Sequence, residues 1–590
     1  MASAVPSAQI GTRTTPPWTK ERAGFLVLFV VGAALLVLSW HGIGMGVLPL
    51  FTGVGNIVHF LAQTVPPQFV DFRYTAYLAL VTLCMAILGT ALAVVLSIPV
   101  ALMAARNTTL HPAVRWVARA VIVVCRSIPD LIFAIIFVES IGIGVLPGVL
   151  ALAFHSVGML GKLYAEQIEQ LPPGPPEAIK STGATRWQAM MTGVVPQVMP
   201  SFSSIALYRL DINLRSSVIL GYVGAGGIGF LLNTYMGELQ FRAAIGIVLV
   251  MFVMIVAMEV TAAVIRRSLI GMEGIPVKGS GASRQSPAAG GFAIRSALLD
   301  RMVARVSPLR AGALQEKVAP GHVGAPAKAE VPNIRPPWTR ARIQRWSFVA
   351  GALALVAASF IVTKTSPWQA LTSLRQIWDT VVLYFPPDFT TARSSLLGGT
   401  MTSFEIAVVA TCTGYVVAIP VGLLAARNVS GRWVARIARL VLLVIRAVPD
   451  LILAIVFVVA VGLGPVAGAM ALFVGTVGFV AKLVADGLEE VSPMPREAVF
   501  SMGATKGQEV AASVVHASTP MLVGNAFYVL DINFRSAIIL GIVGAGGLGF
   551  LLQQSVQVLA YRTTGAIIVC FFVVVLLIEV VTNWVRRNLI

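Results

Sequence analysis

Long apolar runs separated by short polar segments make up most of the chain. A helix needs about 20 residues to cross the ~30 Å hydrocarbon core of a bilayer, and most of the runs reach or approach that length. They lack the short alternating segments of an outer-membrane barrel. The pattern predicts an all-α integral membrane protein with about 12 transmembrane helices, near residues 24–40, 75–103, 116–139, 145–166, 198–222, 243–265, 346–362, 396–424, 434–459, 465–486, 518–542 and 564–585.

The same pattern is written twice along the chain. Pro-Pro-Trp-Thr at 16–19 recurs at 336–339, an offset of 336 − 16 = 320 residues. Solenoid repeats have periods of only up to ~50 residues, so this is a duplicated domain. We expect a first half at 1–270, a linker at 271–335 rich in Gly, Ala and Pro, and a second half at 336–590. Within the linker, 292–306 has two open interpretations, a helix on the membrane surface or a disordered tether.

Composition and charge agree with this architecture. Hydrophobic residues make up 57% of the chain and charged residues 12%, against roughly 25% charged in soluble domains. The net charge of +18 comes from Lys and Arg in loops on one side of the membrane, so we predict no nucleic-acid partner. These flanks predict that both termini lie in the cytoplasm. Each half has an even number of spans, which predicts two parallel six-helix halves related by a pseudo-two-fold axis along the membrane normal.

Residues with catalytic or metal-binding chemistry are sparse. The four cysteines lie in apolar runs without metal-ligand spacing, and Gly161-Lys162 lacks the preceding glycine of a P-loop. We find no nucleophile–base constellation in the sequence. We therefore expect no catalysis, no metal site and no nucleotide site in this chain.

A polar segment between the fourth and fifth spans carries the clearest motif. Pro and Glu open a short helix with a favourable dipole interaction, and a Gly ends it. Such an exposed helix suits docking into a groove of a soluble partner; an amphipathic loop without a partner is the alternative. The residues are Glu177, Ala178 and Gly183 in the first copy and Glu497, Ala498 and Gly503 in the second.

This segment resembles the coupling motif of ABC importer permeases, Glu-Ala-Ala, three residues, then Gly. The wider pattern, including 126–132, 155–163 and 208–216, is similar to phosphonate importer permeases over nearly all of 70–270 and most of 390–590. Typical family members are single half-permeases, so this chain resembles two of them fused. The second copy departs from the pattern, with Val459, Gly475, His516 and Val529 where the first has Glu139, His155, Pro196 and Arg209.

The resemblance implies a type I ABC importer permease fold and ATP-driven import of phosphonates or related phosphorus oxyanions. It also implies two cytoplasmic ATPase subunits, which would bind ATP and Mg, and an external phosphonate-binding protein or lipoprotein. Two alternatives stay open. One is an ABC permease for phosphite, phosphate or methionine, and the other is a secondary transporter coupled to ions through Asp130, Asp211 and Glu259.

Charged residues inside the predicted spans form a second set of candidates. A charge at the bilayer centre costs ~3 kcal/mol or more, so these groups should face the protein interior or a wet cavity. Either each Arg pairs with an Asp one turn away, or the Arg residues present positive potential to an anionic substrate. Arg209 has no counterpart in the second copy, which makes it the better candidate for substrate contact. The set is Arg126, Asp130, Arg209, Asp211, Arg215, Arg446, Asp450, Asp531 and Arg535.

A glycine-rich run follows the fifth span of each half. It matches a dinucleotide fingerprint literally, but a membrane helix precedes it instead of a strand, which excludes that interpretation. We expect a helix break at the outer end of the pathway, with a backbone anion cradle as the alternative. The glycines are Gly224, Gly226, Gly227, Gly544, Gly546 and Gly547.

Overall fold

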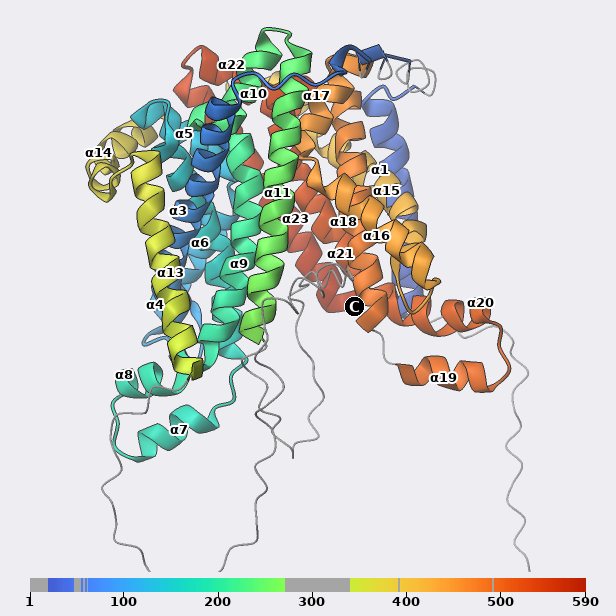
Figure 1. Cartoon of the computed structure of the whole chain (residues 1–590). Coiled ribbons are helices and arrows are strands. Elements are labelled where there is room, and N and C mark those ends of the chain that lie inside the picture. Colours follow the sequence, from blue (N-terminus) through green and yellow to red (C-terminus); the bar gives the residue numbers. More distant parts are fainter. Residues whose placement is uncertain are drawn as a thin grey trace, which may run out of the picture. The chain divides into compact units, whose positions relative to one another are not determined.

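The computed structural model of the chain describes residues 20–46, 55–56, 59–60, 62–270, 340–390, 393–490 and 493–589. Every regular element in these ranges is helical (Figure 1). The linker predicted at 271–335 lies outside the described residues, as does the choice between its two interpretations. The helices group into two compact units. Unit 1 comprises 1–58, 388–446 and 450–590, and unit 2 comprises 59–387 and 447–449.

Unit 2 contains most of the first sequence repeat and also two helices of the second. α13 packs against α3, and α14 packs against α5. The elements are α3 (Phe72–Ala104), α4 (Pro112–Ser127), α5 (Asp130–Ile141), α6 (Val145–Glu169), α7 (Gly174–Ser181), α8 (Arg186–Ala189), the π-helical turn η1 (Met190–Val194), α9 (Val195–Leu220), η2 (Gly221–Ala225), α10 (Gly227–Gly237), α11 (Phe241–Ile270), α13 (Arg340–Thr363) and α14 (Pro367–Leu383).

Unit 1 contains the remainder of the second repeat and the first helix of the chain, which packs against α15. The repeats therefore exchange their first helices between the compact units. The elements are α1 (Lys20–Gly42), α15 (Arg393–Ala425), α16 (Arg432–Ala447), α17 (Asp450–Val461), α18 (Pro465–Glu490), α19 (Pro493–Ser501), α20 (Lys506–Glu509), η3 (Val510–Val515), α21 (His516–Leu540), η4 (Gly541–Ala545), α22 (Gly547–Gln557) and α23 (Tyr561–Leu589).

The apolar helices correspond to the predicted spans. Among the described residues, 8 helices are long and apolar enough to cross a membrane, and 3 bent helix pairs pass the same test. α1 adds a shorter apolar stretch, Leu26–Gly42. An all-helical membrane protein is therefore confirmed.

The third span of each half differs from the single helix expected at 116–139 and 434–459. α4 and α5 meet at an 88° bend, and α16 and α17 meet at 80°. Pro129 has no N–H to continue the helix and disfavours helical geometry at the residue before it. Ile128 is accordingly extended, with φ −84° and ψ 123°.

The core of unit 2 depends on small residues where helices approach closely. A Cβ added at Gly89 of α3 would lie 2.7 Å from Leu152 Cβ of α6. On the next turns of α6, Tyr164 stacks on Phe202 of α9 with ring centroids 3.8 Å apart. Its hydroxyl donates to the Phe202 carbonyl at 3.2 Å, so this buried phenol is satisfied. α6 therefore packs against both α3 and α9, and it ends directly before the predicted coupling segment.

Candidate functional site

The predicted coupling motif of the first half forms a short exposed helix, α7, followed by a turn and α8. Glu177 lies in the first turn of α7, and Glu177 and Ala178 are both exposed. Gly183 has φ +84°, a left-handed conformation that ends the helix and that other residues adopt at a cost. Thr185 then starts α8 with a capping box to Gln188.

The second copy repeats this geometry in α19 and α20. Glu497, Ala498 and Gly503 are exposed, and Gly503 has φ +82°. The structure thus contains the helix–glycine turn that the sequence pattern predicts at both sites. Its role in docking a partner stays a prediction.

One ion pair distinguishes the second coupling segment from the first. Arg496 of α19 pairs through Nε with Glu509 Oε1 of α20, and the Glu509 side chain is only 6% exposed. The first half has Pro176 and Ala189 at these positions. There, the space between α7 and η1 is closed by apolar contact, because a Cβ at Gly193 would lie 2.9 Å from Ile179 Cδ1.

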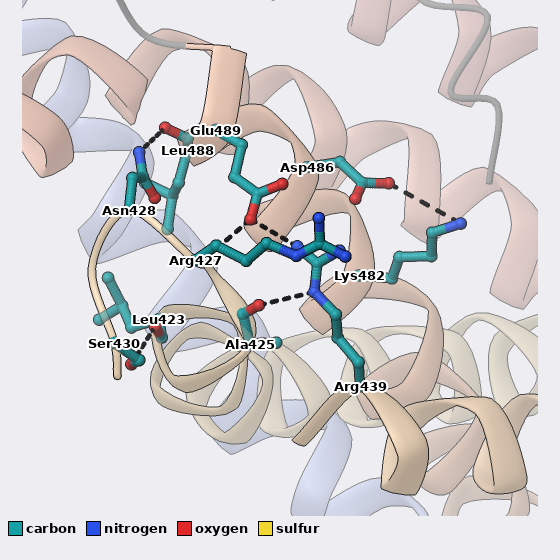
Figure 2. Close-up of polar contacts among 10 residues, drawn as sticks. All are labelled: Leu423, Ala425, Arg427, Asn428, Ser430, Arg439, Lys482, Asp486, Leu488 and Glu489. Atoms are coloured by element: carbon teal, nitrogen blue, oxygen red, sulfur yellow. Dashed lines mark hydrogen bonds and ion pairs between the residues drawn. The ribbon is translucent and has the colours of Figure 1, made fainter. Parts of the chain in front are cut away.

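A polar cluster lies at the base of the second coupling segment, where α15 and α18 end (Figure 2). We call the Glu489–Arg439 pair with its backbone partners the second clamp. Glu489 Oε1 accepts from Arg439 Nη2 at 2.5 Å and from the Arg427 backbone N–H at 2.7 Å. Arg439 Nε donates to the Ala425 carbonyl at 2.8 Å. One carboxylate therefore ties the C-terminal ends of α15 and α18 to α16.

The first half contains a matching first clamp. Glu169 Oε1 accepts from Arg119 Nη2 and from the Arg106 N–H, both at 2.9 Å, and Arg119 Nε donates to the Ala104 carbonyl at 3.2 Å. α6 ends at Glu169 and α7 begins at Gly174, so the clamp holds the chain where it enters the coupling segment. The sequence marks Arg106 and Arg119 only as positive flanks of the spans, and their contact with Glu169 was not predicted, although Arg and Glu recur at equal spacing in both halves.

Two of the predicted intramembrane ion pairs are present in the structure. Arg215 Nη2 donates to Asp211 Oδ2 at 3.2 Å in α9. In α21, Arg535 Nη2 donates to both Asp531 oxygens, at 3.0 and 2.8 Å. These contacts agree with pairing one turn apart on a helix. Whether either Arg also contacts a solute stays a prediction.

The other predicted pairs do not lie one turn apart on a single helix. Arg126 is in the last turn of α4, and Asp130 opens α5 beyond the bend at Pro129. Asp130 is 9% exposed, and its Oδ1 accepts from the Leu131 N–H at 2.9 Å, so its charge lies at a helix N-terminus. Arg446 and Asp450 flank the equivalent break between α16 and α17. The expectation of one continuous helix is wrong here because it ignored the proline.

Arg209 is buried in unit 2, at 4% exposure. Its Nε donates to Ser156 Oγ at 2.8 Å, and Ser156 donates to Asn213 Oδ1 at 3.1 Å. Asn213 Nδ2 donates in turn to Thr90 Oγ1 at 2.9 Å. The resulting polar chain joins α3, α6 and α9. In this conformation, Arg209 is enclosed by protein, so substrate contact would require the helices around it to separate.

An equivalent network lies in unit 1 around Asn533. Its Nδ2 donates to Thr411 Oγ1 and Thr476 Oγ1, both at 2.8 Å. Val529, 1% exposed, stands at the position of Arg209. The structural role of these asparagines was not predicted, although the Asp-Ile-Asn run recurs in both halves.

The glycine runs form helix breaks in both halves. α9 and α10 bend by 58° across η2, where Gly224, Gly226 and Gly227 have φ of +105°, +76° and +72°. Gly544, Gly546 and Gly547 have φ of +101°, +78° and +69°. The Gly224 carbonyl accepts from the Gly144 N–H at 3.1 Å.

One amide that an anion cradle would need is already bonded. The Ile228 N–H donates to Thr82 Oγ1 at 2.8 Å, and Leu548 N–H donates to Ser403 Oγ at 2.9 Å. These bonds anchor α10 to α3 and α22 to α15. The geometry therefore favours close helix packing at the breaks over anion binding.

Comparison with known proteins supports one family. The family described as binding-protein-dependent transport system inner membrane component matches residues 97–270 and 418–590. The phosphate-import permease protein PhnE of Mycolicibacterium smegmatis is 42% identical over 545 residues, covering 92% of this chain and 90% of that protein. The phosphite transport system permease protein PtxC of Stutzerimonas stutzeri is 42% identical over 41% of this chain and 87% of its own.

A further relative, the putative cryptic phosphonate transport system permease protein PhnE2 of Escherichia coli, is 38% identical over 121 residues, covering 20% of this chain and 99% of that protein. Two family matches in one chain agree with the duplication and with the helical membrane fold. The chain belongs to the binding-protein-dependent inner-membrane components, and is the permease subunit of an ABC importer.

Proposed function

We propose that this chain forms the whole translocation pathway of an ATP-driven importer for phosphorus oxyanions, with phosphonates and phosphate as its substrates. The observation that carries the proposal is the 42% identity, over 92% of the chain, to a permease named for phosphate import. The shorter relatives named for phosphite and phosphonate transport support the same class of solute.

The substrate would be an anion, and the helices offer cationic groups for it. Arg215 and Arg535 are each paired with an aspartate, which offsets most of their charge in the conformation described. Arg209 has Val529 as its counterpart, so any solute contact it makes would come from the first half alone. We propose that Arg209 becomes accessible when α3, α6 and α9 move apart during transport.

The coupling segments would each dock one ATPase subunit. Both are exposed, and both begin directly after a clamp that fixes the preceding helix. The positive flanks of the spans support placing these segments and both chain termini in the cytoplasm, at the inner membrane. ATP and Mg would be bound by the ATPase subunits, and an external binding protein would deliver the solute.

Reconstituted transport tests the substrate class. The full chain, with the ATPase and binding protein of its own genome neighbourhood, is placed in proteoliposomes with ATP inside. We expect ATP-dependent uptake of radiolabelled phosphate or methylphosphonate, competed by the other and by phosphite. Methionine should not compete.

Two controls separate the alternatives. ATPase subunits unable to hydrolyse ATP should abolish uptake, and uptake that continues on an ion gradient alone would support a secondary transporter. Uptake of methionine with no uptake of any phosphorus compound would overturn the proposed substrate class.

A further inference from the structure

α14 presents three chemically different faces. Ser373 and, just after the helix, Tyr384 are buried against the rest of unit 2, at 6% and 4% exposure. A second face is mostly apolar and is exposed. Its apolar members are Trp368 (71%), Leu371 (59%), Leu374 (51%), Trp378 (67%) and Val382 (49%), and the exposed Arg375 lies among them, one turn from Leu371 and from Trp378. The remaining face is polar and exposed, and includes Gln369, Thr372, Gln376 and Asp379.

The apolar face does not belong to a transmembrane span. α14 has 17 residues, which at 1.5 Å per residue gives about 26 Å. It carries Arg375 and Asp379, and it is not among the apolar helices long enough to cross a membrane. A surface helix with Trp and Leu on one side and polar residues on another is typical of helices that lie in the interfacial layer.

α14 begins close to the end of a candidate membrane span. It follows α13, a candidate span whose last turn exposes Ile361 at 79%. Lys364, with φ +53°, turns the chain, and Ser366 starts α14 with a capping box to Gln369. In Figure 1, α14 is seen nearly end-on beside the upper end of α13, whereas α7 and α8 lie at the other end of unit 2. α14 therefore runs across the direction of α13, at the end of the unit opposite the coupling helix.

The C-terminal end of α14 is fixed in orientation. The Tyr384 hydroxyl donates to Glu139 Oε2 of α5, and α14 packs along α5. Since one face is held against α5, the directions of the apolar and polar faces are also set. Glu139 is a residue of the first half that the second replaces with Val459, so this anchor belongs to unit 2 specifically.

We propose that α14 lies flat in the lipid headgroup layer, with Leu371, Leu374 and Trp378 in the acyl boundary and Gln376 toward water. A bilayer is the partner favoured by continuity, because the apolar face of α14 follows directly on the exposed apolar end of α13, a candidate span. Trp near both ends of the face fits the enrichment of Trp at membrane interfaces. The inference concerns membrane attachment and does not depend on which solute is transported.

Spin-label accessibility in liposomes tests the proposal on the full chain. Cys84, Cys125, Cys412 and Cys570 are replaced by Ala, and single cysteines are introduced by Leu374→Cys and, as the matched polar-face control, Gln376→Cys. The protein is reconstituted in phosphatidylcholine–phosphatidylglycerol vesicles. We expect the label at 374 to collide more with oxygen than with a water-soluble nickel chelate, and the label at 376 to show the reverse.

A depth measurement completes the test. Labels at Trp368→Cys and Trp378→Cys are ten residues apart, about 15 Å along the helix axis. A flat helix gives the two labels nearly equal depth. A depth difference of about 15 Å would overturn the proposal, as would a label at 374 that contacts mainly the nickel chelate or is shielded from both reagents by protein.

Discussion

The second clamp makes a quantitative prediction about the base of the coupling segment. Glu489→Gln removes the charge of the acceptor but keeps an oxygen for the Arg427 N–H. The Arg439 and Glu489 side chains are 25% and 28% exposed, so the pair is neither fully solvated nor buried. Exposed pairs contribute about 0.2–1 kcal/mol and hydrogen bonds to charged groups about 1.5–3 kcal/mol. We therefore expect Glu489→Gln to lower the free energy of local opening by about 1 kcal/mol.

Glu489→Ala should lower the local stability further, because it removes the acceptor of the Arg427 N–H and of Arg439 Nη2. We expect about 2 kcal/mol for this variant. Each 1.36 kcal/mol is a factor of ten in an equilibrium. Local opening of the segment between α15 and α16 should then increase about 5-fold with Gln and about 30-fold with Ala.

Hydrogen exchange measured by mass spectrometry reports this opening without requiring reversible unfolding. The Glu489 variants of the full chain are measured in lipid nanodiscs. The control variant is Glu490→Gln, which removes the neighbouring exposed carboxylate. The duplication provides a second test, because Glu169→Gln should act on the segment between α3 and α4. The effect should be smaller there, since Arg119 is 42% exposed. Equal exchange in Glu489→Gln and Glu490→Gln would refute the clamp.

Three further predictions concern the rest of the site. Gly183→Val forces a β-branched residue to φ +84°, so we expect less uptake per ATP hydrolysed, whereas Gly507→Ala, which meets open space, should not change this ratio. Asn213→Leu leaves the Ser156 and Thr90 hydroxyls without their amide partner and should cost about 1–3 kcal/mol, measured as a lower thermal midpoint. Arg496→Leu leaves the buried Glu509 carboxylate without its cation, so hydrogen exchange should show a local stability lower by about 3 kcal/mol. Adding Glu509→Ala should recover most of that stability.

The helices and the coupling turns could be predicted from sequence because local physics decides them. Apolar length fixes a span, and Gly183 ends α7 since few other residues adopt its φ without strain. The two prolines differ in effect: the helix breaks at Pro129, whereas α3 continues through Pro99. Whether a proline breaks a helix depends on the packing around it. The hydrophobic pattern does not contain that information, so it predicted one helix where α4 and α5 are separate.

Tertiary contacts account for what sequence reasoning missed. The exchange of first helices leaves each repeat intact in sequence, so no periodicity reveals it. Glu169 meets Arg119 across 50 positions, and Asn213 meets Thr90 across 123. Both contacts depend on how the helices pack, which the sequence does not show. The sequence does show that all four residues recur at equivalent positions of the second half.

The duplication also explains why some differences between the halves come in sets. A half-permease that pairs with an identical copy must accept every substitution twice, whereas a fused chain can change one half alone. Arg496 and Glu509 occur together in the second half, and their counterparts Pro176 and Ala189 are both uncharged. Because a lone buried Glu509 would be costly, the two positions are constrained to differ as a pair. The clamps and the asparagine networks, in contrast, join equivalent positions in both halves.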